Sequence, residues 1–183
     1  TVENGYYSAA FEQFMANREI IAARYEQKYA GSNYPTTGFM QGHPLAGQPY
    51  DSNNGSINKS SPDVMIPAFL AAYTGSSAHN ISLTAFPAMS SILPNWRITY
   101  DGLMQIPAIK EHFKTFTINH TYQCTYAVGS YSSFMNWINT GGDDMGFTLD
   151  ELSGNPIPSS PYDISSVSIT ERFAPFIGVN AKK

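Results

Sequence analysis

The clearest pattern in the chain is a two-residue alternation of apolar and polar side chains that begins at residue 115. From 115 to 128, six of the seven even positions are apolar or aromatic, and six of the seven odd positions are polar. Alternation sustained over this length predicts a β-strand with one apolar and one polar face. A second, less regular alternation over 164–181 predicts another strand, in which Pro175 marks a bulge or an edge.

The N-terminal part follows a helical period instead. Apolar residues recur three and four positions apart and predict an amphipathic helix over about 8–29. A short apolar segment predicts a second helix over about 67–73, with Pro67 in its first turn. Arg18 and Arg24 lie on or beside the apolar stripe of the first helix. The sequence leaves two interpretations of these side chains open: a buried or partner-facing ion pair, or a solvated arginine.

These patterns divide the chain into a helical and irregular region over 1–75 and a strand-forming region over 76–183. Between the two helices the residues are rich in Gly, Pro, Ser and Asn and have no period, which indicates a long irregular loop. The second region is expected to contain strands over about 81–100 (interrupted by proline), 115–137 and 164–181, with a long loop over 139–163.

Composition adds a shortage of charge to this picture. Only 13% of the 183 residues are charged, about half the share of a typical soluble domain, while Ser, Thr and Asn together supply about a quarter of the chain. Either much of the surface does not meet bulk water, or uncharged polar residues replace charge there. The net charge of −4 gives no electrostatic footprint for nucleic acid, so no nucleic-acid partner is expected.

Metal and disulfide chemistry has little support in the sequence. The single cysteine, Cys124, excludes an internal disulfide and any multi-thiolate zinc site. The four histidines lie far apart and lack the spacing of paired metal ligands. We therefore expect no metal and no cofactor.

Two interpretations of the alternating strands remain open at this point. In an outer-membrane barrel one strand face meets lipid and the other a wet lumen, and aromatic residues collect near the headgroups. An antiparallel sheet with one face on an ordinary core and one in water also alternates. His120 and Glu171 lie on the apolar faces and count against lipid exposure at those two positions.

Five segments, taken in order, carry a resemblance to a known family: FEQFMANREIIAARY, DVMIPAFLAAYTG, LPNWRITYDGL, FKTFTINHTYQCTYAVGSY and ISSVSITERFAPFIGV. Together they resemble the SprA/Sov family, the large outer-membrane protein of the Bacteroidetes type IX secretion system, which also serves gliding motility. The resemblance covers most of the chain and is weakest in the Gly- and Ser-rich loops. Its most specific motif contains Pro94, Asn95, Trp96, Arg97, Tyr100, Asp101 and Gly102.

The resemblance implies a mainly β chain that is a fragment of a large antiparallel transmembrane β-barrel, with a helical and loop insertion on its N-terminal side. It implies a segment of a protein-conducting translocon in the bacterial outer membrane, through which folded proteins leave the periplasm. Such a segment is not an enzyme, and the family supplies no catalytic residues. Family members are much longer than this chain, which also lacks an initiator Met, so we expect an excised or mature piece of a larger protein.

A spanning strand over 115–128 assigns a side to each residue. The expected lipid-facing residues are Phe116, Ile118, Tyr122, Cys124, Tyr126 and Val128. The expected lumen-facing residues are Thr117, Asn119, Thr121, Gln123 and Thr125. The expected partners are outer-membrane lipid, secreted cargo proteins, plug or lateral-gate proteins of the translocon, and the remainder of the barrel chain, with Phe14 or Tyr25 as contact points on the first helix.

Two other functions compete with this one. An extracellular β-rich adhesin or glycan-binding module would use Trp96, Trp137 and the many tyrosines as stacking surfaces. An enzyme or calcium site would need the carboxylates of the acidic loop, which are Asp143, Asp144, Asp150 and Glu151. These four lack the alternating spacing of an EF-hand loop, and a solvated acidic loop is the favoured interpretation.

Overall fold

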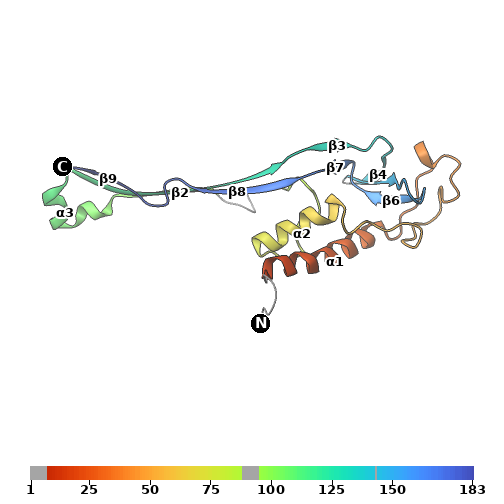
Figure 1. Cartoon of the computed structure of the whole chain (residues 1–183), viewed down its shortest axis with the longest axis horizontal. Coiled ribbons are helices and arrows are strands. Elements are labelled where there is room, and N and C mark those ends of the chain that lie inside the picture. The colour runs from red at the N-terminus through yellow and green to blue at the C-terminus, as the bar shows by residue number, and fades with distance from the viewer. Residues whose placement is uncertain (1–7, 88–94, 143) are drawn as a thin grey trace. The chain divides into compact units, whose positions relative to one another are not determined.

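The computed structural model describes residues 8–87, 95–142 and 144–183, and it combines helices with antiparallel β-sheets (Figure 1). The helices are α1 (Ala9–Tyr29), η1 (Gly38–Met40), α2 (Pro62–Thr74), η3 (Gly102–Gln105) and α3 (Pro107–His112). The strands are β1 (Trp96–Tyr100), β2 (Thr115–Val128), β3 (Tyr131–Ser133), β4 (Ile138–Gly142), β5 (Met145–Leu149), β6 (Pro156–Ser159), β7 (Tyr162–Ile164), β8 (Val167–Phe173) and β9 (Gly178–Lys182). The antiparallel pairing agrees with the expectation from sequence, whereas "mainly β" understates the helical part.

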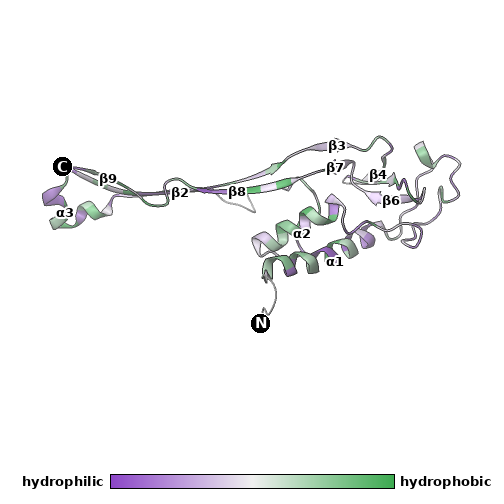
Figure 2. Ribbon diagram, viewed as in Figure 1, coloured by the Kyte–Doolittle hydropathy of each residue, from purple (hydrophilic) through white to green (hydrophobic). Residues whose placement is uncertain are grey.

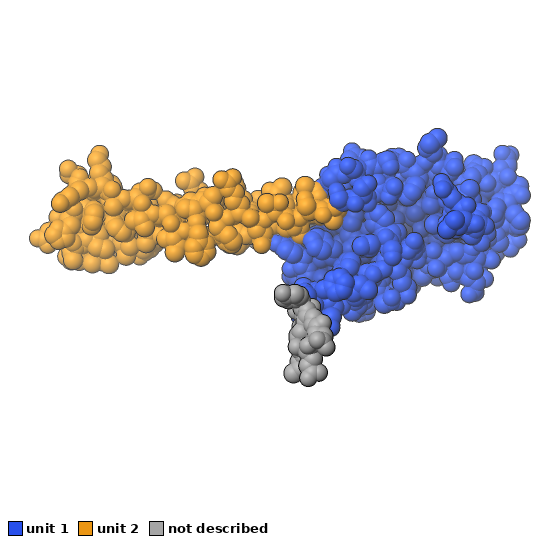
Figure 3. All heavy atoms as spheres, in the orientation of Figure 1, with its two compact units in different colours: residues 1–87, 128–166 blue, residues 88–127, 167–183 orange. Residues whose placement is uncertain are grey.

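The chain forms two compact units (Figure 3). Unit 1 contains residues 1–87 and 128–166, and unit 2 contains residues 88–127 and 167–183. This division differs from the expected boundary at 75/76, because the middle segment folds with the N-terminal helices. The physical reason is Phe147 of β5, which is fully buried in a cluster of aromatic rings from the N-terminal half.

Helix α1 occupies the segment where the apolar period predicted a helix, and it packs beside α2 (Figures 1 and 2). The Ser8 side chain caps its start by accepting a hydrogen bond from the backbone N–H of Phe11. Asn17 is buried between the helices and donates from Nδ2 to the carbonyl oxygen of Ala68 at 3.2 Å. A buried amide that is hydrogen-bonded in this way fixes how α1 and α2 face each other.

Helix α2 begins five residues before the expected start at 67. Pro62 occupies the first helical turn, where its missing N–H costs nothing, so it replaces Pro67 in the predicted role. Pro67 lies inside the helix instead, with its ring fully buried. Gly75 ends the helix in the left-handed conformation (φ +69°), as a C-terminal glycine does.

The expected loop over 139–163 is wrong, because this segment contains short strands. Strands β4, β5 and β6 form an antiparallel sheet, and β3 pairs with β7. The strands are too short to show alternation, and Pro156 and Pro158 of β6 mark an edge strand that has no neighbour beyond it in the described sheet.

A cluster of aromatic rings holds this sheet to the helical part of unit 1. The centroid of the Phe147 ring lies 5.2 Å from those of Tyr29 and Tyr34 and 5.8 Å from that of Tyr50. Burial of one large side chain of this kind stabilises a fold by about 1.5–3 kcal/mol. The cluster therefore explains why Gly- and Pro-rich strands remain ordered here.

Unit 2 is built around β2, which pairs with β1 on one side and with β8 and β9 along the other. The expected strand over 115–137 ends at Val128, before Gly129. The expected strand over 164–181 is divided into β8 and β9, because Pro175 has no N–H to donate and the chain turns between them. Of the expected strand over 81–100, only β1 is a strand, residues 81–87 are not, and 88–94 lie outside the described residues.

Candidate functional site: the two-faced sheet of unit 2

One face of the unit 2 sheet, here called the apolar face, gathers side chains from all four strands. The Cα register places Trp96 opposite Tyr122, and it places Ile118 opposite both Tyr100 and Val179. Paired residues in an antiparallel sheet point to the same face, so the even positions of β1 and β2 and the odd positions of β9 share this face. The rings of Trp96 and Tyr122 stack with centroids 4.2 Å apart.

The large hydrophobic side chains of the flanking segments on this face are exposed. The exposed fraction is 40% for Trp96, 56% for Ile98, 53% for Tyr100 and 55% for Val179. Among the predicted lipid-facing residues of the central strand, Tyr122 and Cys124 are buried, while Phe116, Ile118, Tyr126 and Val128 are half-buried. The lipid-facing residues predicted from the sequence did not include these flanking side chains, although Trp96, Ile98 and Tyr100 alternate along β1.

The opposite face, here called the polar face, carries the predicted lumen-facing residues. Thr117 and Asn119 are half-buried, as is Thr121, whereas Gln123 and Thr125 are exposed. Arg97 lies opposite Thr121 on the same face. Gly178 lies opposite Asn119, and a Cβ there would meet Asn119 Oδ1 at 2.1 Å, so a larger residue would require the Asn119 side chain to move.

The two polar residues on the apolar face have hydrogen-bond partners within unit 2. The hydroxyl of Tyr122 donates to Oε1 of Glu171 at 2.6 Å. His120 lies with Nδ1 2.5 Å from the carbonyl oxygen of Phe176. A hydrogen-bonded polar group costs much less in an apolar environment than an unpartnered one, which weakens the sequence-based objection to an apolar setting at these two positions.

The most specific motif of the sequence shapes the end of β1. Pro94 lies outside the described residues, and Asn95 accepts a hydrogen bond at Oδ1 from the backbone N–H of Cys124 at 2.6 Å. After β1, the Asp101 carbonyl accepts from the N–H of Met104 and opens helix η3. A Cβ on Gly102 would lie 2.6 Å from the Tyr100 hydroxyl, so a larger residue there would require the exposed Tyr100 ring to move.

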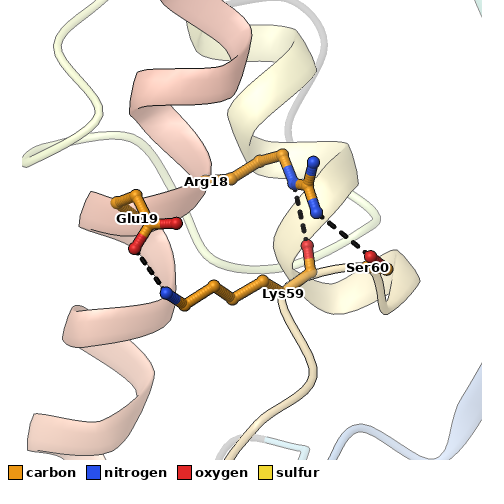
Figure 4. Close-up of polar contacts among 4 residues, drawn as sticks. All are labelled: Arg18, Glu19, Lys59 and Ser60. Atoms are coloured by element: carbon orange, nitrogen blue, oxygen red, sulfur yellow. Dashed lines mark hydrogen bonds and ion pairs between the residues drawn. The ribbon is translucent and has the colours of Figure 1, made fainter.

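The two arginines of α1 bind backbone and side-chain oxygens rather than carboxylates. Arg18 donates from Nε to the carbonyl of Lys59 and from its guanidinium to Oγ of Ser60 (Figure 4). Arg24 donates to the carbonyls of Ala78 and Ile81 at 2.8 and 2.9 Å. Both arginines therefore hold the following loops against α1. They form neither the ion pair nor the solvated side chain that the sequence left open.

The two residues of α1 that were expected to contact a partner, Phe14 and Tyr25, differ in solvent exposure. The Tyr25 hydroxyl donates to the carbonyl of Leu83, and burial raises the pKa of this side chain, so Tyr25 is a core residue. Phe14 is half-buried beside Phe11, which is 61% exposed, and the Arg18 guanidinium lies over the Phe14 ring. Of the two residues expected to contact a partner, Phe14 is therefore the more accessible, and the exposed Phe11 lies beside it.

The acidic loop does not converge on one point in the described residues. Asp144 occupies the tight turn between β4 and β5 with φ +55°. Asp150 accepts hydrogen bonds from the N–H and the Oγ of Ser153, and these bonds lower the pKa of its carboxyl. Glu151 is exposed, and Asp143 lies outside the described residues. In the described parts of the chain, no three His, Cys, Asp or Glu side chains are grouped so that they could hold a metal ion.

No protein-family model matches the chain, and no curated protein matches it. Among the described helices, none combines the length and the apolar character needed to cross a membrane.

Proposed function

We propose that the chain is a segment of an outer-membrane protein-conducting translocon of the SprA/Sov type, which exports folded proteins in type IX secretion. The observation that carries the proposal is the separation of the unit 2 sheet into an exposed apolar face and a polar face. In this proposal the apolar face meets lipid and the polar face lines the pore. The resemblance in five ordered segments of the sequence supports the same assignment.

The length of β2 suits this role. Its 14 residues rise by about 3.3 Å each, which gives a strand of about 46 Å. A transmembrane strand tilted by about 45° needs about 9–11 residues, so β2 is long enough to cross the hydrocarbon core. A soluble sheet has no such length requirement, and its strands are usually five or six residues long.

The outer edges of the sheet supply a reason for partner strands. β1 pairs only with β2 in the described sheet, which leaves its other edge without a strand neighbour. Each unpaired backbone group costs several kcal/mol in hydrocarbon, so a sheet edge in a bilayer must pair with further strands. In this proposal the remainder of a longer barrel chain supplies them.

Unit 1 contains irregular backbone and buried polar groups, and it has its own core. Irregular backbone is not tolerated in contact with lipid, so in this proposal unit 1 lies in water, inside the pore or outside the membrane. There it contacts secreted cargo or a plug or lateral-gate protein, and the exposed Phe11 beside Phe14 on α1 is the surface that it offers.

The second candidate, an adhesin or glycan-binding module, draws on the exposed rings of Trp96 and Tyr100. Trp137 does not belong to that platform, because it lies in unit 1 and donates from Nε1 to the carbonyl of Ser159. A glycan platform needs rings that meet water, whereas the translocon needs the same rings in lipid. The two functions therefore make opposite predictions for one face.

Adjacent positions on β1 and on β9 distinguish the two functions, because neighbouring side chains on a strand point to opposite faces. In a Cys124→Ser background, cysteine is introduced singly at Ile98 and Val179 on the apolar face, and at the adjacent Thr99 and Asn180 on the opposite face. The variants are produced in bacterial outer membranes and treated with a lipid-soluble or a membrane-impermeant maleimide. Each adjacent pair shares its strand and depth and differs only in face.

We expect cysteines at 98 and 179 to resist both maleimides in the membrane, because a thiol in hydrocarbon does not form the reactive thiolate. The lipid-soluble reagent should label them once the protein is unfolded in detergent. Cysteines at 99 and 180 should react with the impermeant reagent when it reaches the pore. Equal reaction of all four positions with the impermeant reagent would contradict the proposed function and favour the glycan-binding module.

A further inference from the structure

Charge is divided unequally between the two compact units. Unit 1 contains four basic and eleven acidic residues, for a net charge of −7, whereas unit 2 contains six basic and three acidic residues, for a net charge of +3. The modest overall charge of −4 hides this difference. Unit 2 therefore has a net positive charge, although the whole chain has a net negative charge.

Three cations of unit 2 belong to the polar face of its sheet. Arg97 lies opposite Thr121, and Lys182 lies opposite Thr115, which places both on the face of the odd β2 residues. Glu171 and Phe173 contact Tyr122 on the apolar face, so the intervening Arg172 points to the polar face. All three side chains are exposed.

The acidic residues of unit 2 lie elsewhere. Glu171 is on the apolar face, Asp101 follows the end of β1, and Glu111 belongs to α3. Among the described residues, the structure gives the guanidinium groups of Arg97 and Arg172 neither a hydrogen-bond nor an ion-pair partner. An arginine without a carboxylate keeps its five donors available for a ligand.

A shallow depression lies beside Arg97. Its volume is about 570 Å³, and its polar lining includes Arg97 of β1 and Asn119, Thr121 and Gln123 of β2. The lining is completed by Asn95, Trp96, Tyr122, Ala174 and Pro175. Amide and hydroxyl groups beside a guanidinium form the set of donors that binds a carboxylate with charge-assisted hydrogen bonds. The guanidinium therefore makes the polar part of the depression suited to an acidic side chain rather than a basic one.

We infer that the polar face of the unit 2 sheet is a docking surface for an acidic polypeptide segment, with Arg97 and Arg172 as the residues that bind its carboxylates. Arg97 and Arg172 come from the two strands that flank the middle of β2, and Lys182 extends the basic surface toward the start of that strand. The uncharged Thr, Asn and Gln side chains between them donate to the peptide backbone. This inference rests on the proposed function for its setting, since there the face lines the pore and the segment belongs to exported cargo or a gate protein.

The test measures binding of labelled peptides to the full chain in an uncharged detergent. The probes are a hexaglutamate peptide, a hexaserine peptide and a hexalysine peptide, each with an uncharged dye, followed by fluorescence anisotropy. The variants are Arg97→Gln and Arg172→Gln, with Lys28→Gln as the matched control, because Lys28 is an exposed cation of unit 1. Circular dichroism verifies that each variant is folded.

We expect hexaglutamate to bind at least tenfold more tightly than the other two peptides, with affinity that falls as salt rises. Arg97→Gln and Arg172→Gln should each weaken binding about threefold or more, while Lys28→Gln changes it less than twofold. Equal loss in all three variants would show a net-charge effect and overturn the inference, as would the failure of hexaglutamate to bind. The cysteine-labelling experiment tests the proposed function separately. If hexaglutamate binds as expected but the impermeant maleimide labels cysteines on both faces, the proposed function is contradicted and the docking surface is not.

Discussion

The hydroxyl of Tyr29, on the last turn of α1, bonds both backbone groups of Gly146 in β5, the central strand of its sheet. It donates to the Gly146 carbonyl at 2.8 Å and accepts from the Gly146 N–H at 3.0 Å. Tyr29 is 1% exposed, so these bonds form away from water. One side chain from the helical half therefore anchors the sheet that the sequence presented as a loop.

Tyr29→Phe removes both hydrogen bonds and retains the ring. Because a buried backbone donor and acceptor lose their partner, we expect a loss of about 1–3 kcal/mol in the free energy of unfolding. Urea unfolding followed by circular dichroism measures it. Tyr131→Phe is the control, since Tyr131 is 61% exposed. If both variants unfold at the same urea concentration as the wild type, the anchoring role is wrong.

Gly146→Ala tests the close approach of backbone and ring at the same position. A Cβ at residue 146 would lie 2.3 Å from the Ile138 carbonyl oxygen and 2.4 Å from the Trp137 ring. We expect a loss of more than about 3 kcal/mol, because backbone must move to relieve the overlap. Gly142→Ala in β4 meets nothing within 4 Å and should change stability by less than about 1 kcal/mol. Similar thermal unfolding of the two variants would contradict the packing described here.

Asp63 of α2 predicts a pH dependence of stability. Its carboxyl is buried, with Oδ2 accepting from the N–H of Ser160 at 3.0 Å, and burial raises its pKa above the ordinary 3.8. The folded state thus holds this proton more tightly than the unfolded state, so the contribution of Asp63 to stability falls as pH rises above about 3.8 through the raised pKa.

Asp63→Asn keeps an acceptor for Ser160 and removes the titration. We expect the variant to be at least as stable as the wild type at pH 7, with the difference shrinking as the pH is lowered toward 4. Urea unfolding at a series of pH values measures this, and Asp101→Asn controls for the removal of one exposed charge. A difference that grows toward low pH would have the wrong sign for a raised pKa.

Periodicity was informative wherever an element was long. It predicted the place of α1 and the two-faced character of β2, because a stripe of several turns and an alternation of fourteen residues average out single exceptions. Beyond Val128, Gly129 ends that strand, and β3 has only three residues. Short elements have no period to detect.

The assignment of 139–163 as a loop failed for a physical reason. Gly146 and Pro158 are poor strand residues on local preference alone, and their order comes from tertiary contacts such as the aromatic cluster around Phe147. The same holds for the polar face, where Arg97 is far in the sequence from Arg172 and Lys182. Only the pairing of β1, β8 and β9 with β2 brings them to one surface.

The most direct test of lipid contact uses the two tryptophans of the chain, one in each unit. Trp137→Phe leaves Trp96 on the apolar face, and Trp96→Phe leaves Trp137, which is half-buried in unit 1. In membranes that contain lipids brominated on their acyl chains, we predict strong quenching of Trp96 fluorescence and little quenching of Trp137. Equal quenching of the two, or no quenching of Trp96, would contradict a sheet whose apolar face meets lipid.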